Sequence, residues 1–236
     1  MRVLVACEES QAVTIRFRER GHEAYSCDIC RPSGGHEEWH IQGDVLPVLQ
    51  GKPFYTMDDV RHRGGGWNMI IGFPPCTYLT NAGAARLFRD VHENEFQMIN
   101  TERLMKGIRA RDFFLAILNA DCRHIAVENP VPSSIYCMPE PTQMIEPYWF
   151  GHPYSKRTCL WLKNLPKLRP TKIVEPQISW VSGGSKKADG TQRENMGMTF
   201  RDSTRKSKTF DGIAKAMADQ WSDIGDYRDD EQPELF

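Results

Sequence analysis

Short apolar runs that end on polar residues or prolines recur through the first part of the chain and predict buried strands. These runs are residues 2–7, 23–28, 41–45, 67–71 and 124–130. The spacing predicts a helix from Ser10, as its cap, to about Arg20, where Gly21 ends it. Residues 102–119 form a second amphipathic pattern. Strands that alternate with helices predict an α/β fold with a doubly wound, mostly parallel sheet.

The composition fits one α/β domain without a global basic surface. The chain has 236 residues, a formal net charge of −1 and seven cysteines. An odd number of scattered cysteines favours free thiols in a reducing compartment. The opening "MRVLVACEES" lacks the pattern of a signal peptide, and no apolar stretch reaches membrane-spanning length. We therefore expect a cytoplasmic protein without a membrane segment.

The pattern changes after Pro153. Residues 1–165 are predicted to form the core, which includes a strand at 156–162, and residues 166–202 a small basic, loop-rich region. Residues 203–225 hold a helix that returns to the core, and 226–236 are an acidic tail without an expected fold. Basic residues gather in this half, at Lys156, Arg157, Lys163, Lys167, Arg169, Lys172, Lys186, Lys187, Arg201, Arg205, Lys206 and Lys208. This cluster favours contact with a polynucleotide backbone.

Polar side chains follow each predicted strand. In an open α/β sheet, ligands bind beyond the carboxyl ends of the strands. These ends carry Glu8 and Ser10, Asp28, Asp44, Cys76, and Glu128 with Asn129. An acid after the second strand is typical of a site that binds ribose hydroxyls. A thiol beside a glutamate suggests covalent chemistry with an acid/base partner, whereas the alternative for Cys76 is a buried apolar cysteine.

Two motifs resemble those of the DNA cytosine-C5 methyltransferases, in the short form found in phages and prophages. "GFPPCTYLT" (72–80) resembles the Pro-Cys motif of that family, and "VENP" (127–130) resembles its Glu-Asn-Val motif. The likeness spans about 2–165 and resumes around 203–221. "ACEESQ" (6–11) stands where the family has a glycine-rich loop, and "YSKRT" (154–158) where it has Gln-x-Arg-x-Arg.

The resemblance implies a Rossmann-like methyltransferase fold that uses S-adenosylmethionine to methylate C5 of a flipped cytosine in DNA. Cys76 would attack C6, and Glu128 would bind the N3/N4 edge of the base. The implied catalytic residues are Cys76, Glu128, Asn129, Lys156 and Arg157. The implied cofactor-binding residues are Cys7, Glu8, Ser10, Asp28, Ile29, Asp44, Val45, Phe73 and Pro74. In this scheme Asp28 binds the ribose and Asp44 the adenine edge.

The resemblance also implies how the enzyme meets DNA. Residues 80–101 would form a loop that closes over the site. Only residues about 163–203 could read the target, so little sequence specificity is expected. The ending Gln232–Phe236 resembles the short peptide by which bacterial proteins dock onto the replication sliding clamp.

Three other interpretations remain open or less favoured. The chain could methylate a free cytidine nucleotide, or it could be a catalytically inactive DNA-binding relative. Cys27, Cys30, His36 and His40 have zinc-ligand types. A metal site is nevertheless not expected, because the interval between the two pairs is shorter than in ordinary zinc fingers and Cys27 falls within a predicted strand.

Overall fold

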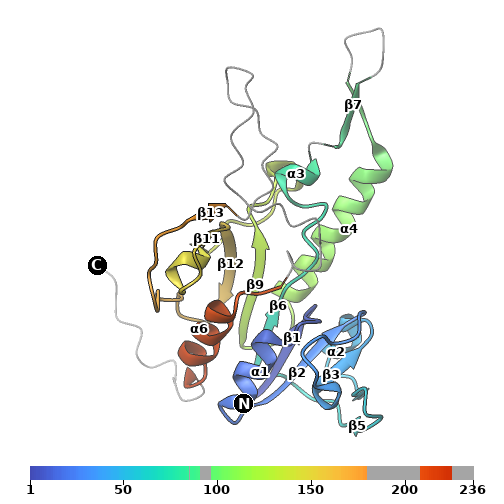
Figure 1. The fold of residues 1–236 in the computed structure, drawn as a ribbon. Coiled ribbons are helices and arrows are strands. Elements are labelled where there is room, and N and C mark those ends of the chain that lie inside the picture. Colours follow the sequence, from blue (N-terminus) through green and yellow to red (C-terminus); the bar gives the residue numbers. More distant parts are fainter. Residues whose placement is uncertain (85, 91–96, 180–207, 225–236) are drawn as a thin grey trace, which may run out of the picture.

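A seven-stranded sheet forms the centre of the computed structural model, which describes residues 1–84, 86–90, 97–179 and 208–224 (Figure 1). The strands run in the spatial order β10-β12-β9-β6-β1-β2-β3. Their bounds are Arg2–Ala6 (β1), Glu23–Asp28 (β2), His40–Gln42 (β3), Met69–Gly72 (β6), His124–Pro130 (β9), Gln143–Ile145 (β10) and Thr158–Lys163 (β12).

The spatial order of the strands confirms the predicted doubly wound, mostly parallel sheet. From β1 the chain builds outwards to β2 and β3 on one side, and to β6 and β9 on the other, always in parallel. β12 alone runs antiparallel to its two neighbours in this sheet. The strand order therefore reverses at β1 and β6, and in open sheets of this kind ligands bind beyond the carboxyl ends of the strands at such a point.

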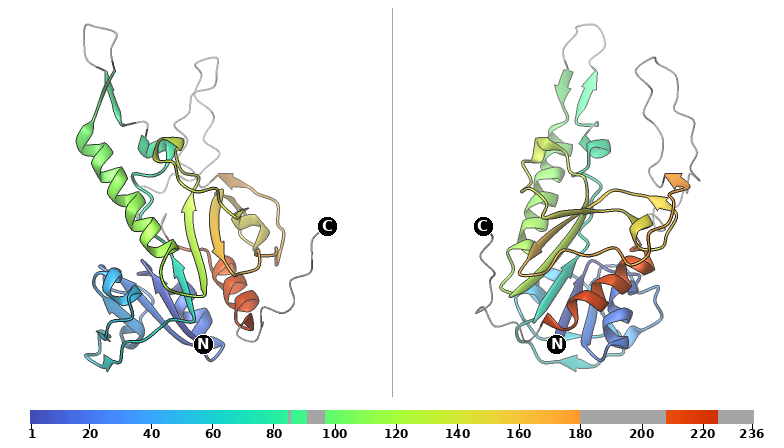
Figure 2. Two further views of the ribbon diagram at one scale, coloured as in Figure 1. Left: turned by 180° about the vertical axis from the view of Figure 1, so that it is seen from behind. Right: turned by 90° about the vertical axis from the view of Figure 1, so that its left-hand side faces the viewer.

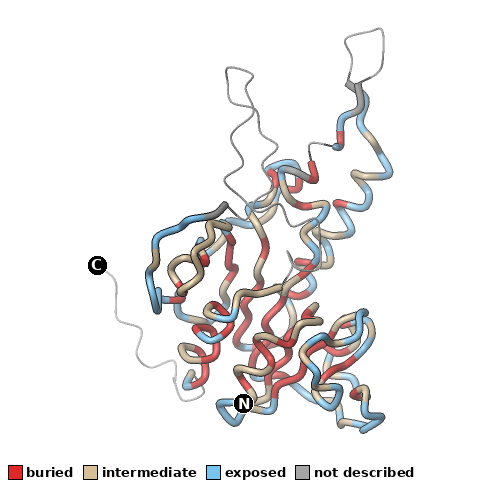
Figure 3. The backbone as a smooth tube through the Cα atoms, viewed as in Figure 1, coloured by how far each residue is buried: buried red, intermediate tan, exposed pale blue. Residues whose placement is uncertain are grey.

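Alternating side chains of β1 supply two separate cores, because successive residues of a strand point to opposite faces. Val3 and Val5 pack with α1 (Ala12–Glu19) and α6 (Asp211–Trp221), whereas Leu4 packs on the other face with α2 and α4. The bounds of those two helices are Val45–Leu49 (α2) and Thr101–Leu118 (α4). Figure 2 shows α4 on the opposite face from α1 and α6, and Figure 3 shows the strands buried between these layers.

The remaining elements are small sheets and short helices outside the seven-stranded sheet. Three two-stranded sheets are β4–β5, β7–β8 and β11–β13. Their strands are Phe54–Tyr55 (β4), Arg61–His62 (β5), Phe88–Asp90 (β7), Gln97–Ile99 (β8), Tyr154–Ser155 (β11) and Ile178–Ser179 (β13). Short helices occupy Glu37–Trp39 (η1), Asn81–Ala84 (α3), Ser134–Tyr136 (η2) and Pro147–Trp149 (η3). The β7–β8 hairpin and the start of α4 project as an arm from one end of the molecule (Figure 1).

The last described helix lies against the first. α6 contacts α1, and Arg16 on α1 forms an ion pair with Asp211 on α6 at 2.7 Å. Trp221 is fully buried and donates a hydrogen bond from its ring N–H to the carbonyl of Pro166. The loop at 182–197 and the tail at 226–236 lie outside the described residues. Within the described part of the chain, no helix combines the length and apolarity needed to cross a lipid bilayer.

Two local predictions were wrong at their boundaries. Ser10 does not cap the first helix, which begins at Ala12 after Gln11 in a left-handed conformation. The third strand ends at Gln42, and Asp44 instead caps α2 by accepting a hydrogen bond from the N–H of Leu46 at 3.0 Å. Both errors arise where a polar residue that could end one element serves the start of the next.

Candidate active site

The loop that carries Cys76 is fastened to the end of the neighbouring strand. Gly72 ends β6, and two prolines follow before Cys76, which is half-buried. The buried Asn129, at the end of β9, donates a hydrogen bond to the carbonyl of Pro74 at 3.1 Å. The carbonyl of Cys76 accepts hydrogen bonds from the N–H groups of Leu79 and Thr80. Asn129 therefore braces the thiol-bearing turn.

Glu128 faces a hollow between the sheet and the segment before α6. Its neighbour β12 runs antiparallel, so that the start of β12 returns to the carboxyl end of β9. Thr158, the first residue of β12, donates a hydrogen bond from its hydroxyl to the carbonyl of Lys156 and lies close enough to Glu128 to lower its pKa. Both residues and Lys156 line a hollow that is open to solvent. A carboxyl group, a hydroxyl group and an ammonium group thus converge at one edge of the sheet.

The charges of this edge act on one another. Burial raises the pKa of the Cys76 thiol, the carboxylate of Glu128 raises it further, and Lys156 lowers it. Burial also raises the pKa of Glu128, while Lys156 and the Thr158 hydroxyl act in the opposite direction. Because burial disfavours the charged form, Glu128 retains a proton more readily than an ordinary glutamate, and Lys156 favours whichever anion forms.

The side chain of Arg157 lies near a different carboxylate from that of Lys156. It is exposed, and its Nε atom lies 3.6 Å from the Oε1 atom of Glu146. The pKa of Cys76 responds to Lys156 and Glu128 rather than to Arg157. Of the two predicted cations, the structure thus brings Lys156 to the thiol and leaves Arg157 beside Glu146.

The first loop turns without glycine. Cys7 and Gln11 hold backbone φ angles of 60° and 58°, in the left-handed region that costs about 1 kcal/mol for a residue with a side chain. Glu8 is 3% exposed and accepts hydrogen bonds from the N–H groups of Val13 and Thr14 at 2.6 and 3.2 Å. The predicted cofactor residue Glu8 is therefore engaged with the N-terminus of α1. Ser10 is half-buried beside this turn.

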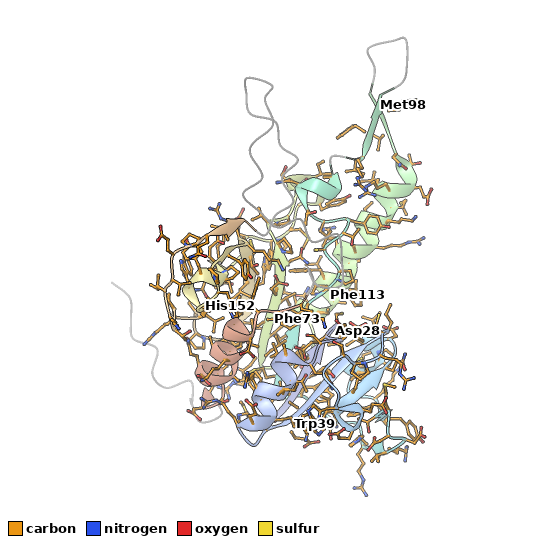
Figure 4. The ribbon with its side chains drawn as sticks, in the orientation of Figure 1. Asp28, Trp39, Phe73, Met98, Phe113 and His152 are labelled. Carbon is orange, nitrogen blue, oxygen red and sulfur yellow. The ribbon has the colours of Figure 1, made fainter. Side chains whose placement is uncertain are left out.

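Two carboxylates meet at the thiol of Cys7. Burial raises its pKa far above the usual range, and Asp28, Cys27 and Asp44 raise it further. Asp28, labelled in Figure 4, is half-buried at the end of β2, and Asp44 is exposed at the start of α2. Asp28 accepts a hydrogen bond from the N–H of Cys30 at 2.9 Å. The predicted grouping of acids beyond β1, β2 and β3 is present in the structure.

The remaining predicted cofactor residues differ in their access to solvent. Ile29 is 76% exposed directly after Asp28, which leaves an apolar surface at this edge. Val45 and Pro74 are buried. Phe73, labelled in Figure 4, is half-buried and lines the same hollow as Glu128.

The segment before α6 supplies residues that the sequence interpretation missed. Thr209 and Phe210 line the hollow opposite Glu128. Lys208 also lines it, donates a hydrogen bond to the hydroxyl of Ser33 at 2.9 Å and lies 3.8 Å from Glu9. The only local signal for Thr209 and Phe210 was their position just before an amphipathic helix, which says nothing about where that helix docks. Lys208 was predicted only as a member of the basic cluster.

The members of the predicted basic cluster that the structure describes do not form one surface. Lys163 pairs with Ile125 near the start of β9, at the opposite edge of the sheet from Glu128. Arg169 follows on that side and exchanges hydrogen bonds with Gln220 near the end of α6. Lys186, Lys187, Arg201, Arg205 and Lys206 lie outside the described residues.

The cysteine and histidine residues considered as zinc ligands serve other contacts. His40 is buried, with its ring hydrogen-bonded to the hydroxyl of Ser26 and the carbonyl of Cys30. His36 stacks on Trp39 and pairs with Glu38. Across the described ranges, no three His, Cys, Asp or Glu side chains are grouped as metal ligands would be.

Comparisons with known proteins place few constraints on this chain. No protein-family model matches it, and no curated protein matches it. One similar solved structure is described as a candidate DNA modification methyltransferase encoded within an E. coli prophage, with a TM-score of 0.42 and 11% identity. A mutant of DNMT2 from Spodoptera frugiperda has a TM-score of 0.34 and 15% identity.

These structures are longer than the present chain. The alignments cover 76% and 74% of this chain but only 53% and 54% of the two structures, so the chain spans about half their length. Both TM-scores lie below 0.5, and neither similarity bears on the chemistry of the site.

Proposed function

We propose that this protein transfers a methyl group from S-adenosylmethionine to C5 of cytosine in DNA, through a covalent adduct between Cys76 and the base. The observation that supports this most is the pairing of Cys76 with Glu128 on adjacent strand ends, joined by the hydrogen bond from Asn129 to Pro74. Lys156 completes the group as a cation that acts on both. Cytosine C5 methylation requires a nucleophile for C6 and an acid for N3, and these residues offer both.

The strand ends beyond β1, β2 and β3 fit the cofactor. Asp28 and Asp44 offer carboxylate oxygens for ribose hydroxyls and an adenine amino group, and the exposed Ile29 offers an apolar surface for a ring. These residues would hold S-adenosylmethionine, and Phe73 would separate it from the base. When bound, S-adenosylmethionine supplies the electrophilic methyl group that C5 takes up.

The residues of the chain account for the remaining chemistry. The Cys76 thiolate forms a bond to C6, and the electrons of the C5–C6 double bond move towards N3, where Glu128 supplies a proton. The raised pKa of Glu128 suits this donation. The base is then nucleophilic at C5. After C5 has taken up the methyl group, solvent water accepts the C5 proton, and the C–H electrons restore the C5–C6 double bond and expel the Cys76 thiolate. Glu128 recovers its proton from N3.

The arm beside the site favours DNA over a free nucleotide as the substrate. Phe88, Met98 (labelled in Figure 4) and Ile99 on the β7–β8 hairpin are exposed, as are Arg86 just before the hairpin and Arg109 on α4. Apolar side chains on a projecting element with nearby cations suit contact with stacked bases and phosphates. A free cytidine nucleotide has no need of such an arm. The recognised DNA sequence would be short, because only residues about 163–203 could form a recognition segment.

The test is covalent trapping with labelled S-adenosylmethionine and a DNA duplex that carries 5-fluorocytosine. Fluorine cannot leave C5 as a proton does, so the adduct should persist and be visible as a shifted protein band. Cys76→Ser should abolish it, whereas Cys137→Ser, which alters an exposed cysteine, should not. An adduct that survives Cys76→Ser would refute the proposal. Parallel incubations with single-stranded DNA and with dCMP decide between polynucleotide and nucleotide substrates.

The proposed docking of the tail onto a sliding clamp concerns Gln232–Phe236, outside the described residues. A short tail with two adjacent apolar anchors makes few contacts, so its affinity should be about micromolar. Fluorescence anisotropy of a labelled 226–236 peptide against a bacterial clamp tests this, with the double Leu235→Ala/Phe236→Ala peptide as control. Equal binding of the two peptides, or no binding, would remove this part of the proposal.

A further inference from the structure

The main chain of Lys156 is held by two side chains. Its N–H donates a hydrogen bond to the Oε2 atom of Glu146 at 2.8 Å. Its carbonyl accepts a hydrogen bond from the Thr158 hydroxyl at 3.1 Å. Lys156 lies between β11 and β12, outside either strand, so these bonds take the place of a sheet ladder.

Glu146 is tied to the sheet on one side and to this turn on the other. It follows β10, whose last residue Ile145 pairs with Thr158. Its side chain is 13% exposed, and its second oxygen lies 3.6 Å from Nε of Arg157. The carboxylate is therefore a fixed bridge from the edge of the sheet to residues 156–157.

The position of the Lys156 ammonium matters because it faces three other groups of the site. Its Nζ atom lies 5.8 Å from the centre of the Phe210 ring, and Lys156 lines the hollow with Glu128. It lowers the pKa of both Cys76 and Glu128, and among the residues that the structure describes Glu128 is the only other charged group that shifts the pKa of the Cys76 thiol.

We propose that Glu146 is a positioning residue, which holds the main chain of Lys156 so that its ammonium group stays beside Cys76 and Glu128. This inference rests on the proposed function for its importance, because it concerns the reactivity of the same thiol. Glu146 itself touches neither the thiol nor Glu128 in the contacts described above. It acts through the N–H of Lys156.

Two substitutions separate positioning from direct charge. Glu146→Gln removes the negative charge but keeps an oxygen that can accept the hydrogen bond of Lys156. Glu146→Asp keeps the charge, but its side chain is one methylene shorter, so the carboxylate lies farther from the N–H of Lys156. If Glu146 positions Lys156, the Asp variant should leave about tenfold less Cys76 thiolate at a given pH, as is typical when a nearby cation is lost. The Gln variant should stay close to the wild type. A purely electrostatic role predicts the reverse order, with more thiolate in the Gln variant and no change in the Asp variant.

The measurement is the pH dependence of alkylation of Cys76 by iodoacetamide, followed on the Cys76 peptide by mass spectrometry because the chain has seven cysteines. Lys156→Gln removes the ammonium group itself and should therefore show the largest loss of thiolate. Glu140→Gln, which alters an exposed acid in the same part of the chain, serves as the matched control. Circular dichroism checks that each variant is folded. Equal profiles for the wild type and the Asp variant would overturn the proposal.

This assay contains neither DNA nor S-adenosylmethionine. If Cys76 failed to trap 5-fluorocytosine while the Asp variant lost thiolate as expected, the proposed function would be wrong and the positioning role of Glu146 would stand. If trapping succeeded and the Asp variant behaved like the wild type, the reverse would hold.

Discussion

The buried carboxyl group of Glu8 should make the stability of the protein depend on pH in an unusual direction. Burial raises the pKa of Glu8 from 4.5 to about 7, and the hydrogen bonds from Val13 and Thr14 offset only part of this. Between these two pH values, the folded chain keeps a proton that the unfolded chain has released. The unfolded state then binds fewer protons, so the free energy of unfolding falls as the pH rises.

The size of the effect follows from the two pKa values. Below pH 4.5 both states are protonated and the contribution of Glu8 to stability is fully present. It is lost as the pH rises through about 7, above which both states are ionised. At about 1.4 kcal/mol for each pKa unit, this loss is about 3 kcal/mol. Most acids that are paired in a folded protein shift stability in the opposite direction.

Glu8→Gln isolates this contribution. Glutamine cannot titrate, but its oxygen can still accept a hydrogen bond from the N-terminus of α1. The free energy of unfolding in urea, followed by circular dichroism from pH 4.5 to 8, should fall by about 3 kcal/mol more in the wild type than in the variant. Glu19→Gln, which alters an exposed acid on the same helix, should follow the wild type. A constant difference between the wild type and Glu8→Gln over this range would refute the reasoning.

Three further variants test other parts of the structure. Glu128→Gln should lower kcat for methyl transfer about 10²-fold or more with little change in KM for DNA, because the proton that it gives to N3 is needed in the transition state; unchanged turnover would exclude that role. Asp28→Ala should weaken S-adenosylmethionine binding in calorimetry about tenfold without unfolding the chain, and undiminished binding would mean that the cofactor lies elsewhere. Gly212→Ala would place a Cβ atom 2.0 Å from the carbonyl oxygen of Phe150 and should destabilise the fold in urea by about 2 kcal/mol or more, whereas Gly66→Ala, which has open space around it, should not. Equal stability of these two glycine variants would contradict the close packing of α6.

Much of the candidate active site could be predicted from the chain because a parallel sheet imposes a simple rule. Apolar runs mark the strands, and the residue types that stop them mark the carboxyl ends. Since parallel strands end at one edge, Cys76 and Glu128 could be placed side by side without knowledge of any long-range contact. The grouping of Asp28 with Cys7 followed from the same rule.

The errors occurred where one residue can satisfy either of two neighbouring elements. Ser10 has the local chemistry of a helix cap, yet it accepts only a long hydrogen bond of 3.5 Å from the N–H of Ala12, and Glu8 accepts those of Val13 and Thr14 from inside the fold. The choice depends on burial, because the left-handed turns at Cys7 and Gln11 direct the longer side chain inwards. Local propensity carries no information about that enclosure.

Only the tertiary structure decided which distant residues complete the site. Thr158, Glu146 and Phe210 reach Glu128 or Lys156 because β12 runs antiparallel and α6 docks beside β1. The direction of an added edge strand and the docking of a terminal helix depend on the total apolar surface that the whole chain can bury. No short window of sequence contains that sum, so the strand ends were predictable and the residues that enclose them were not.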